Sequence, residues 1–354
     1  MKPEPKAGGA AGSLPSLDGI RAVAFGLVFL SHQGLGNLIP GSFGVTIFFM
    51  LSGFLITTLM MQERERYGRV AIRYFYLRRF LRLTPPLLVV LAFALLLAAA
   101  GLTERSATAL GVISILTYWV NYLMLFSSSF QIPAGLGVLW SLAVEEHFYL
   151  LWPWLFVLLA PLARPLMLRW MCLLLLLFLC WRIFLFVVLK AAPDYLLHAS
   201  DTRMDSLLFG CLLALAWRRD PARESFQHAW ADILLATTLL LITFLLRDND
   251  FRGTLRFSLQ GLAMLPLFYY AVRQPGLVCF RWLNHPVATY VGRRSYVLYL
   301  VHEVMLNLIQ GQYPALPPVL AALLSLALSL AFAELCWRMV EAPLLPLRSR
   351  LRPR

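Results

Sequence analysis

Long apolar runs, each suited to a membrane-crossing helix, divide almost the whole chain. A helix needs roughly 20 apolar residues to cross the hydrocarbon core of a bilayer. A soluble fold could not bury so many such segments, so lipid is the expected solvent. The sequence therefore predicts an all-α, polytopic transmembrane helical bundle of about ten spans. The runs lie at residues 17–34, 43–61, 86–101, 147–162, 167–189, 207–217, 233–246, 257–272, 295–310 and 316–340.

The composition supports a single membrane domain. Hydrophobic residues make up 60% of the 354 residues and charged residues only 14%, outside the usual balance of soluble domains. We expect a disordered cytoplasmic segment at residues 1–16, a transmembrane domain at 17–341 and a basic cytoplasmic tail at 342–354. The first run carries Asp18 and Arg21 and lacks a small-residue cleavage site, so a retained span is expected rather than a signal peptide.

Basic residues are distributed unevenly between the connections. The formal net charge of +13 comes mainly from short clusters between apolar runs, as the preference of Lys and Arg for cytoplasmic connections predicts. This distribution places both termini in the cytoplasm and argues against a nucleic-acid partner. One outer connection breaks the pattern, because it holds Arg247, Arg252 and Arg256.

Residues 107–126 form an additional apolar stretch that is long enough to cross. A crossing there would move Arg164 and Arg169 to the outside, against the charge rule. We therefore expect a re-entrant or interfacial helix, which is tolerated where the protein encloses a cavity.

The five cysteines form no binding pattern. They lie in apolar surroundings without CxxC spacing, which indicates neither a metal site nor a disulfide framework. Buried thiols are the simplest interpretation of Cys172, Cys180, Cys211, Cys279 and Cys336.

The first run carries ionisable residues near both of its ends. Asp18 is expected to cap the helix. Arg21 and His32 are eleven residues apart, which corresponds to about three turns, or about 16 Å, along one helix face. Ionisable groups within spans are costly and are functional-site candidates by default. The alternative is structural, with Arg21 reaching the inner interface and His32 lying near the outer one.

A second polar group lies in the segment WSLAVEEHFY at residues 140–149. Glu145 and Tyr149 are four residues apart and share a helix face, whereas Glu146 points elsewhere. One carboxylate is therefore available to orient a catalytic group while the other caps or pairs structurally. Further candidates are Arg203 and Asp205, His302 and Glu303, and Glu334 and Arg338. The last two are spaced as a structural ion pair, and His302 has an alternative as a buried, hydrogen-bonded histidine.

Five motifs, in order along nearly the whole chain, resemble the signatures of the acyltransferase 3 family. They are LDGIRA at residues 17–22 with His32, GVTIFFMLSGFLI at 44–56, FYLRR at 75–79, WSLAVEEHFY at 140–149 and SYVLYLVH at 295–302. The resemblance implies a bacterial-type membrane O-acyltransferase that moves an acyl group, expected to be acetyl, from cytoplasmic acyl-CoA to an acceptor hydroxyl. The sequence departs from the family at His147, where Gln is usual, and at Thr46, where a carboxylate is common.

The resemblance also implies which residues act. The Arg and His of the first span are the family's functional pair, here Arg21 and His32. We expect His32 to be the general base, oriented by Glu145 or Glu146. Guanidinium groups match phosphate geometry, so a cluster of arginines is expected to hold the CoA phosphates. This cluster is Arg78, Arg79 and Arg82, and the remaining candidates are Asp18, Ser141, Tyr149 and His302. No tightly bound cofactor and no metal are expected.

The acceptor class stays open at this stage. Members of the family acylate carbohydrates, lipid-linked glycans or small hydroxylated molecules, often in modifying the cell surface from the inner membrane. Some relatives carry an additional extracellular domain, so this chain is expected to act alone or with a separate periplasmic partner. A rival interpretation is a transporter or flippase of a polar or glycan substrate, because charges that face a bundle interior also mark substrate pathways. A non-catalytic scaffold is the third alternative.

Overall fold

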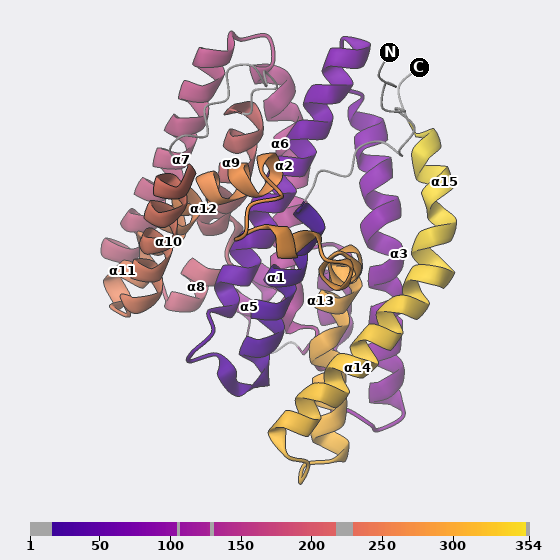
Figure 1. Ribbon diagram of the computed structural model, residues 1–354. Coiled ribbons are helices and arrows are strands. Elements are labelled where there is room, and N and C mark those ends of the chain that lie inside the picture. The colour runs from indigo at the N-terminus through magenta and orange to yellow at the C-terminus, as the bar shows by residue number, and fades with distance from the viewer. Residues whose placement is uncertain (1–15, 105–106, 128–130, 217–228, 352–354) are drawn as a thin grey trace.

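The computed structural model describes residues 16–104, 107–127, 131–216 and 229–351. Within these ranges the protein is helical, with 82% helix and no strands, as the sequence predicts. Figure 1 shows the long helices running roughly along one direction, as expected for a membrane bundle. Residues 1–15 of the expected disordered segment lie outside the described ranges.

The first half of the chain contains the helices from α1 to α7. The helices are α1 (Leu17–Leu30) with a π-helical turn η1 (Ser31–Leu35), α2 (Gly41–Tyr67), α3 (Ile72–Ala99), α4 (Ala109–Leu116), α5 (Val120–Phe126), a 3-10 turn η2 (Gly137–Leu139), α6 (Trp140–Leu159) and α7 (Arg164–Val187).

The second half completes the bundle. Its helices are α8 (Pro193–His198), α9 (Ser200–Ala216), α10 (Ala229–Leu245), α11 (Asn249–Gly253), α12 (Arg256–Arg273), η4 (Arg281–Asn284), α13 (Pro286–Gln312), α14 (Pro318–Cys336), a π-helical turn η5 (Trp337–Glu341) and α15 (Ala342–Arg350). The expected basic tail is thus mostly helix.

Each predicted apolar run overlaps a helix, but the count of about ten spans is not confirmed. Within the described residues, five helical segments are long and apolar enough to cross a membrane. Other helices fall short in length or carry more polar residues; α1 has 14 residues and α9 has 17. The five segments still identify a multi-pass membrane protein. They are Gly41–Tyr67, Ile72–Ala99, Gly137–Leu159, Arg164–Val187 and Pro318–Arg350.

The stretch at residues 107–126 contains two short helices, α4 and α5, instead of one long one. They have eight and seven residues, so each is only about 12 Å long, against the ~30 Å of a hydrocarbon core. The chain turns between them at Tyr118, which has a positive φ of 58°. This geometry agrees with the prediction that the stretch does not cross as a single helix.

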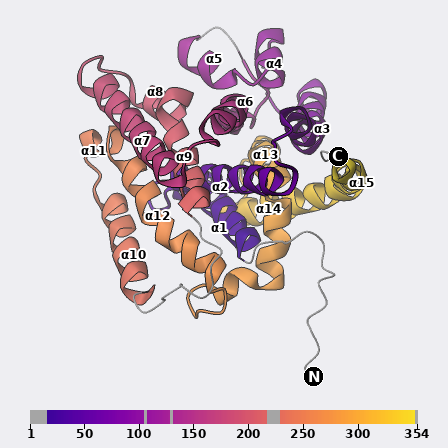
Figure 2. The ribbon, with the colours of Figure 1, turned by 90° about the horizontal axis from the view of Figure 1, so that it is seen from above.

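Close helix contacts place α2 at the centre of the bundle. Figure 2 shows α9, α7, α12 and α10 on one side of α2 and α3, α14 and α15 on the other. The packing of α2 on α9 requires glycine, because a Cβ at Gly53 would lie 1.9 Å from the backbone oxygen of Leu207. Small residues allow such close approach of helices in membranes.

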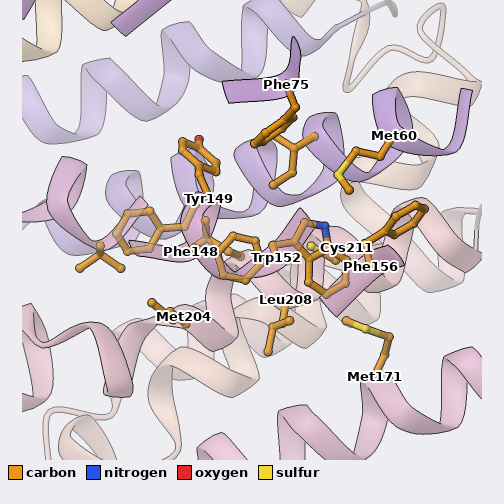
Figure 3. Packing of buried hydrophobic residues seen from close by; sticks show 14 of the residues in the cluster. Met60, Phe75, Phe148, Tyr149, Trp152, Phe156, Met171, Met204, Leu208 and Cys211 are labelled. Atoms are coloured by element: carbon orange, nitrogen blue, oxygen red, sulfur yellow. The ribbon is translucent and has the colours of Figure 1, made fainter. Parts of the chain in front are cut away.

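A buried aromatic cluster fixes the position of α6. Phe148 and Trp152 stack with ring centroids 5.6 Å apart, and Trp152 and Phe156 are almost completely buried. Figure 3 shows these side chains between Met60 and Phe75 on one side and the side chains of α9 and α7 on the other. Because this face of α6 is held tightly, the polar residues one or two turns earlier have a defined direction.

Candidate active site

Residues at the two ends of α1 and η1 line two different cavities. Arg21 lies in the second turn of α1, and its guanidinium forms an ion pair with Asp18 at 2.5 Å. The predicted capping role of Asp18 is wrong, because α1 already begins at Leu17 and Asp18 belongs to its first turn. Asp18 instead bridges to α13 through Arg293 at 3.3 Å. His32 lies in the π-helical turn η1, a feature frequent at functional sites.

The cavity that contains Arg21 is called here the arginine cavity. It has a volume of about 90 Å³, several times the ~10–15 Å³ that one water needs. Helices α1, α2, α3, α6 and α13 all contribute to it. Its polar lining consists of Arg21, Ser52, Arg79, Arg82, Ser141, Glu145, Tyr149, Ser295, Tyr296 and Tyr299.

Glu145 accepts two hydrogen bonds inside the arginine cavity. Ser52 donates at 3.0 Å and the Tyr149 hydroxyl at 2.8 Å. The Arg79 guanidinium lies over the Tyr149 ring, 4.1 Å from its centroid. The shared face predicted for Glu145 and Tyr149 is therefore confirmed. Glu146 points elsewhere, and its buried Oε1 has no hydrogen-bond partner among the described residues.

The three arginines of α3 separate into two environments. Arg79 and Arg82 line the arginine cavity, as their spacing of three residues allows. Arg78 does not line it. Its guanidinium pairs with Glu63 at 2.8 Å and donates to the Leu351 carbonyl at 2.7 Å, so it ties α3 to the preceding helix and to the end of the chain.

The cavity that contains His32 is called here the histidine cavity, and its volume is about 450 Å³. Arg247, which lines it, donates to the Asn37 carbonyl at 3.2 Å and so joins the α10–α12 connection to the loop after η1. Burial lowers the pKa of His198, the last residue of α8. The polar lining consists of Ser31, His32, Asn37, Ser42, His198, Thr243, Arg247, Arg252, Arg256, Gln260 and Tyr299.

A chain of hydrogen bonds sets the protonation pattern of His32. His32 Nδ1 lies 2.9 Å from His302 Nε2, and His302 Nδ1 lies 2.7 Å from the Tyr299 carbonyl. A carbonyl only accepts, so His302 Nδ1 carries hydrogen. His302 is fully buried and contacts no carboxylate in the described structure, and an unpaired buried charge is costly, so the ring is neutral. His302 Nε2 then accepts from His32 Nδ1, which leaves the Nε2 lone pair of a neutral His32 free.

The predicted orientation of His32 by Glu145 or Glu146 is wrong. The two rings of His32 and His302 stack with centroids 5.2 Å apart, whereas Glu145 is bonded to Ser52 and Tyr149 in the other cavity. Helix periodicity shows which residues of a helix share one face, but it does not show that α1 packs on α13.

Tyr299 and Val45 line both cavities. The Tyr299 hydroxyl lies 2.7 Å from Ser141 Oγ and also donates to the Val138 carbonyl at 3.1 Å. Tyr299 was not among the sequence candidates, although it lies one helical turn before His302 within the SYVLYLVH motif. The two cavities therefore meet at this tyrosine.

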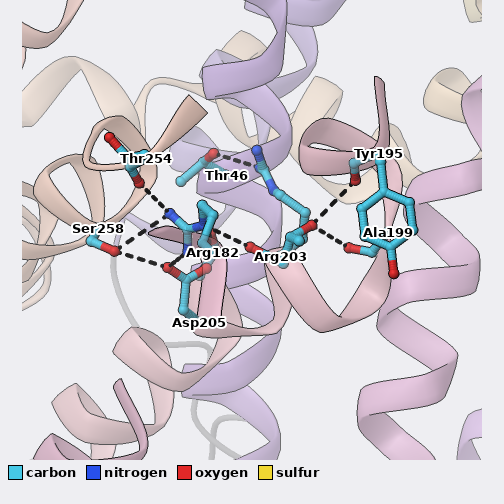
Figure 4. Close-up of polar contacts among 10 residues, drawn as sticks. Thr46, Arg182, Tyr195, Ala199, Arg203, Asp205, Thr254 and Ser258 are labelled. Carbon is cyan, nitrogen blue, oxygen red and sulfur yellow. Dashed lines mark hydrogen bonds and ion pairs between the residues drawn. The ribbon is translucent and has the colours of Figure 1, made fainter. Parts of the chain in front are cut away.

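Arg203 and Asp205 lie in a buried polar cluster next to the histidine cavity. Asp205 forms an ion pair with Arg182, and Arg203 donates to Thr46 Oγ1 at 2.9 Å (Figure 4). The hydroxyl of Thr46 thus meets a cation where a carboxylate is common in the family. Elsewhere, the predicted ion pair of Glu334 and Arg338 is confirmed at 2.7 Å.

Comparison with known proteins identifies the family. A family model described as an acyltransferase domain matches residues 14–338, and the chain belongs to this acyltransferase 3 family. Membership confirms the predicted class, an enzyme that transfers acyl groups. No solved structure matches the chain.

Two relatives illustrate the range of similarity. The chain is 31% identical over 352 residues to the peptidoglycan O-acetyltransferase OatA of Listeria monocytogenes, covering 94% of the chain and 56% of that relative. It is 28% identical over 349 residues to the O-acetyltransferase OatA of Staphylococcus aureus, covering 94% of the chain and 57% of the relative. The chain thus spans little more than half the length of the curated relatives it matches.

Proposed function

We propose that this chain is a membrane O-acetyltransferase that moves an acetyl group from cytoplasmic acetyl-CoA to a hydroxyl of a carbohydrate on the other side of the inner membrane. The family and the names of its relatives support the acetyl group and the carbohydrate acceptor. The observation that carries the proposal is the pair of cavities that meet at Tyr299, one lined by arginines and the other by His32.

The donor enters the arginine cavity. Guanidinium groups bind phosphate oxygens in paired hydrogen bonds, so Arg79 and Arg82 hold the CoA phosphates near the cytoplasmic end of α3. A volume of about 90 Å³ does not accommodate the nucleotide, which stays outside next to its phosphates. The pantetheine arm passes through the cavity and carries the acetyl thioester toward Tyr299, where the two cavities meet. Glu145 holds Tyr149, on which Arg79 lies, and thereby positions a donor-binding arginine.

The acceptor enters the histidine cavity, where His32 is the general base. Its free Nε2 takes the proton of the acceptor hydroxyl while that oxygen attacks the acetyl carbonyl carbon. A C–O bond forms, the C–S bond breaks, and the proton passes from His32 to the CoA thiolate. The hydrogen bond from His32 Nδ1 to His302 becomes charge-assisted as His32 gains the proton, so it is stronger in the transition state than in the ground state.

Vesicles of defined sidedness test the proposal. Inverted vesicles of producing cells, given radiolabelled acetyl-CoA, should transfer label to lumenal glycan and release CoA, whereas right-side-out vesicles should not. His32→Gln should reduce transfer by about 10²–10⁴ with little change in the KM for acetyl-CoA. His285→Gln is the matched control, because His285 is exposed and lines neither cavity. Near-normal turnover in folded His32→Gln would refute the catalytic role, and glycan movement without CoA release would favour the flippase.

A further inference from the structure

Three arginines in the histidine cavity have no topogenic explanation. Arg247, Arg252 and Arg256 lie in or beside the connection between α10 and α12, at the end of the bundle where the charge rule predicts few basic residues. The hydrogen bond from Arg247 to Asn37, in the loop after η1, places this connection at the same end as His32. Something other than membrane insertion must therefore account for their position.

These arginines face no carboxylate among the described residues of the histidine cavity. No carboxylate side chain is among the residues that line the histidine cavity, and none of the three arginines has an ion-pair partner in the described part of the chain. The buried Nε of Arg256 has no hydrogen-bond partner there either. The cavity thus offers guanidinium donors that a ligand can use.

A second feature concentrates positive charge at the same place. The Phe257 ring contacts three guanidinium groups, with the centres of Arg203, Arg256 and Arg182 at 3.6, 4.6 and 5.5 Å from its centroid. Of these three, only Arg182 is paired with a carboxylate within the described ranges, namely Asp205 (Figure 4). Arg203 is fully buried, and its Nε and Nη1 have no partner among the described residues. The wall behind Arg256 is therefore a source of uncompensated positive potential.

Gln260 adds a neutral polar group to the cavity. It is 1% exposed and lines the cavity, and its Oε1 accepts no hydrogen bond within the described residues. An orphaned buried acceptor is costly unless a donor reaches it. A sugar hydroxyl is such a donor, so the cavity has partners for both a hydroxyl and an anionic group.

We infer that the acceptor is an anionic carbohydrate, with a carboxylate or phosphate group bound by Arg252 and Arg256 and a hydroxyl bound by Gln260. The inference rests on the proposed function in one respect only, which is that the bound carbohydrate is the acceptor. The binding preference itself is independent of catalysis, so it is tested by binding alone.

The test compares three sugars of similar size: glucuronic acid, glucose 6-phosphate and glucose. The full chain, purified in an uncharged detergent, is titrated with each at equal ionic strength, and the shift in melting temperature gives the apparent Kd. We expect at least one anionic sugar to bind about tenfold or more tightly than glucose, since hydrogen bonds to charged groups are the stronger ones. The two anionic sugars distinguish a carboxylate site from a phosphate site.

Variants locate the effect. Arg252→Gln combined with Arg256→Gln should remove the preference for the anionic sugars, and the corresponding Lys variants should retain part of it. Arg281→Gln is the matched control, because Arg281 is exposed and lies outside the cavity. His32→Gln should keep the preference even if it abolishes transfer, which separates this inference from the proposed function. An equal response to all three sugars, or a preference that survives in the folded double Gln variant, would overturn the inference.

Discussion

Replacing His302 tests whether this buried ring orients the proposed base. In His302→Leu the bond from His32 Nδ1, 2.9 Å long in the structure, is lost. A neutral hydrogen bond contributes about 1 kcal/mol and one to a charged group about 1.5–3 kcal/mol. The bond is neutral in the ground state and charge-assisted in the transition state, so its loss raises the barrier by about 1–1.5 kcal/mol, or about tenfold in kcat. Loss of tautomer control adds to this effect.

The assay separates orientation from general damage. CoA release is measured against acetyl-CoA concentration, and we expect kcat to fall while KM for the donor is unchanged, because His302 does not line the arginine cavity. His302→Gln should recover part of kcat, since an amide oxygen can accept from His32 Nδ1. Melting temperatures of both variants control for folding. A folded His302→Leu with kcat within twofold of the parent, or a Gln variant no faster than the Leu variant, would refute the reasoning.

Two further predictions concern the donor site and the packing of α2. The double variant Arg79→Ala, Arg82→Ala should raise the KM for acetyl-CoA about tenfold or more. Arg78→Ala removes an ion pair outside the cavity, so it should lower the melting temperature without changing this KM. An equal rise in KM for both proteins would contradict the assignment. Gly53→Ala should lower the unfolding free energy by about 3 kcal/mol because its Cβ would meet a backbone oxygen of α9, while Gly26→Ala, with open space around it, should be neutral in the same melting assay.

The helices and several residues of the arginine cavity could be predicted from the sequence. Apolar runs located the helices because each must satisfy its own backbone hydrogen bonds in lipid. The cost of charges in spans marked Arg21 and Glu145, which the structure places in one cavity. Spacing of four residues then placed Tyr149 beside Glu145. These inferences use only one helix at a time.

The partner of His32 and the role of Arg78 could not be predicted in this way. His302 is 270 residues away in sequence, and only the packing of α1 on α13 brings the two rings together. Arg78 and Arg79 are adjacent, so a cluster of like residues does not show which one faces the cavity. The arginines of the α10–α12 connection were visible as an exception to the charge rule. The sequence could not show that they line one cavity, because several helices form that cavity.

The last prediction concerns Tyr299, where the two cavities meet. If its side chain separates the acetyl thioester from the water of the histidine cavity, Tyr299→Ala should join the two cavities and admit water to the thioester. We expect acetyl-CoA hydrolysis without acceptor to rise severalfold relative to transfer, since a closed site protects reactive groups from water. Tyr296→Ala is the matched control, because Tyr296 lines the arginine cavity but not the histidine cavity, and its hydroxyl donates to the Leu83 carbonyl at 2.7 Å. Both variants are assayed in detergent for CoA release with and without acceptor glycan. If the ratio of hydrolysis to transfer is unchanged in a folded Tyr299→Ala protein, Tyr299 does not form the boundary, and the two cavities are separated by other groups such as Val45.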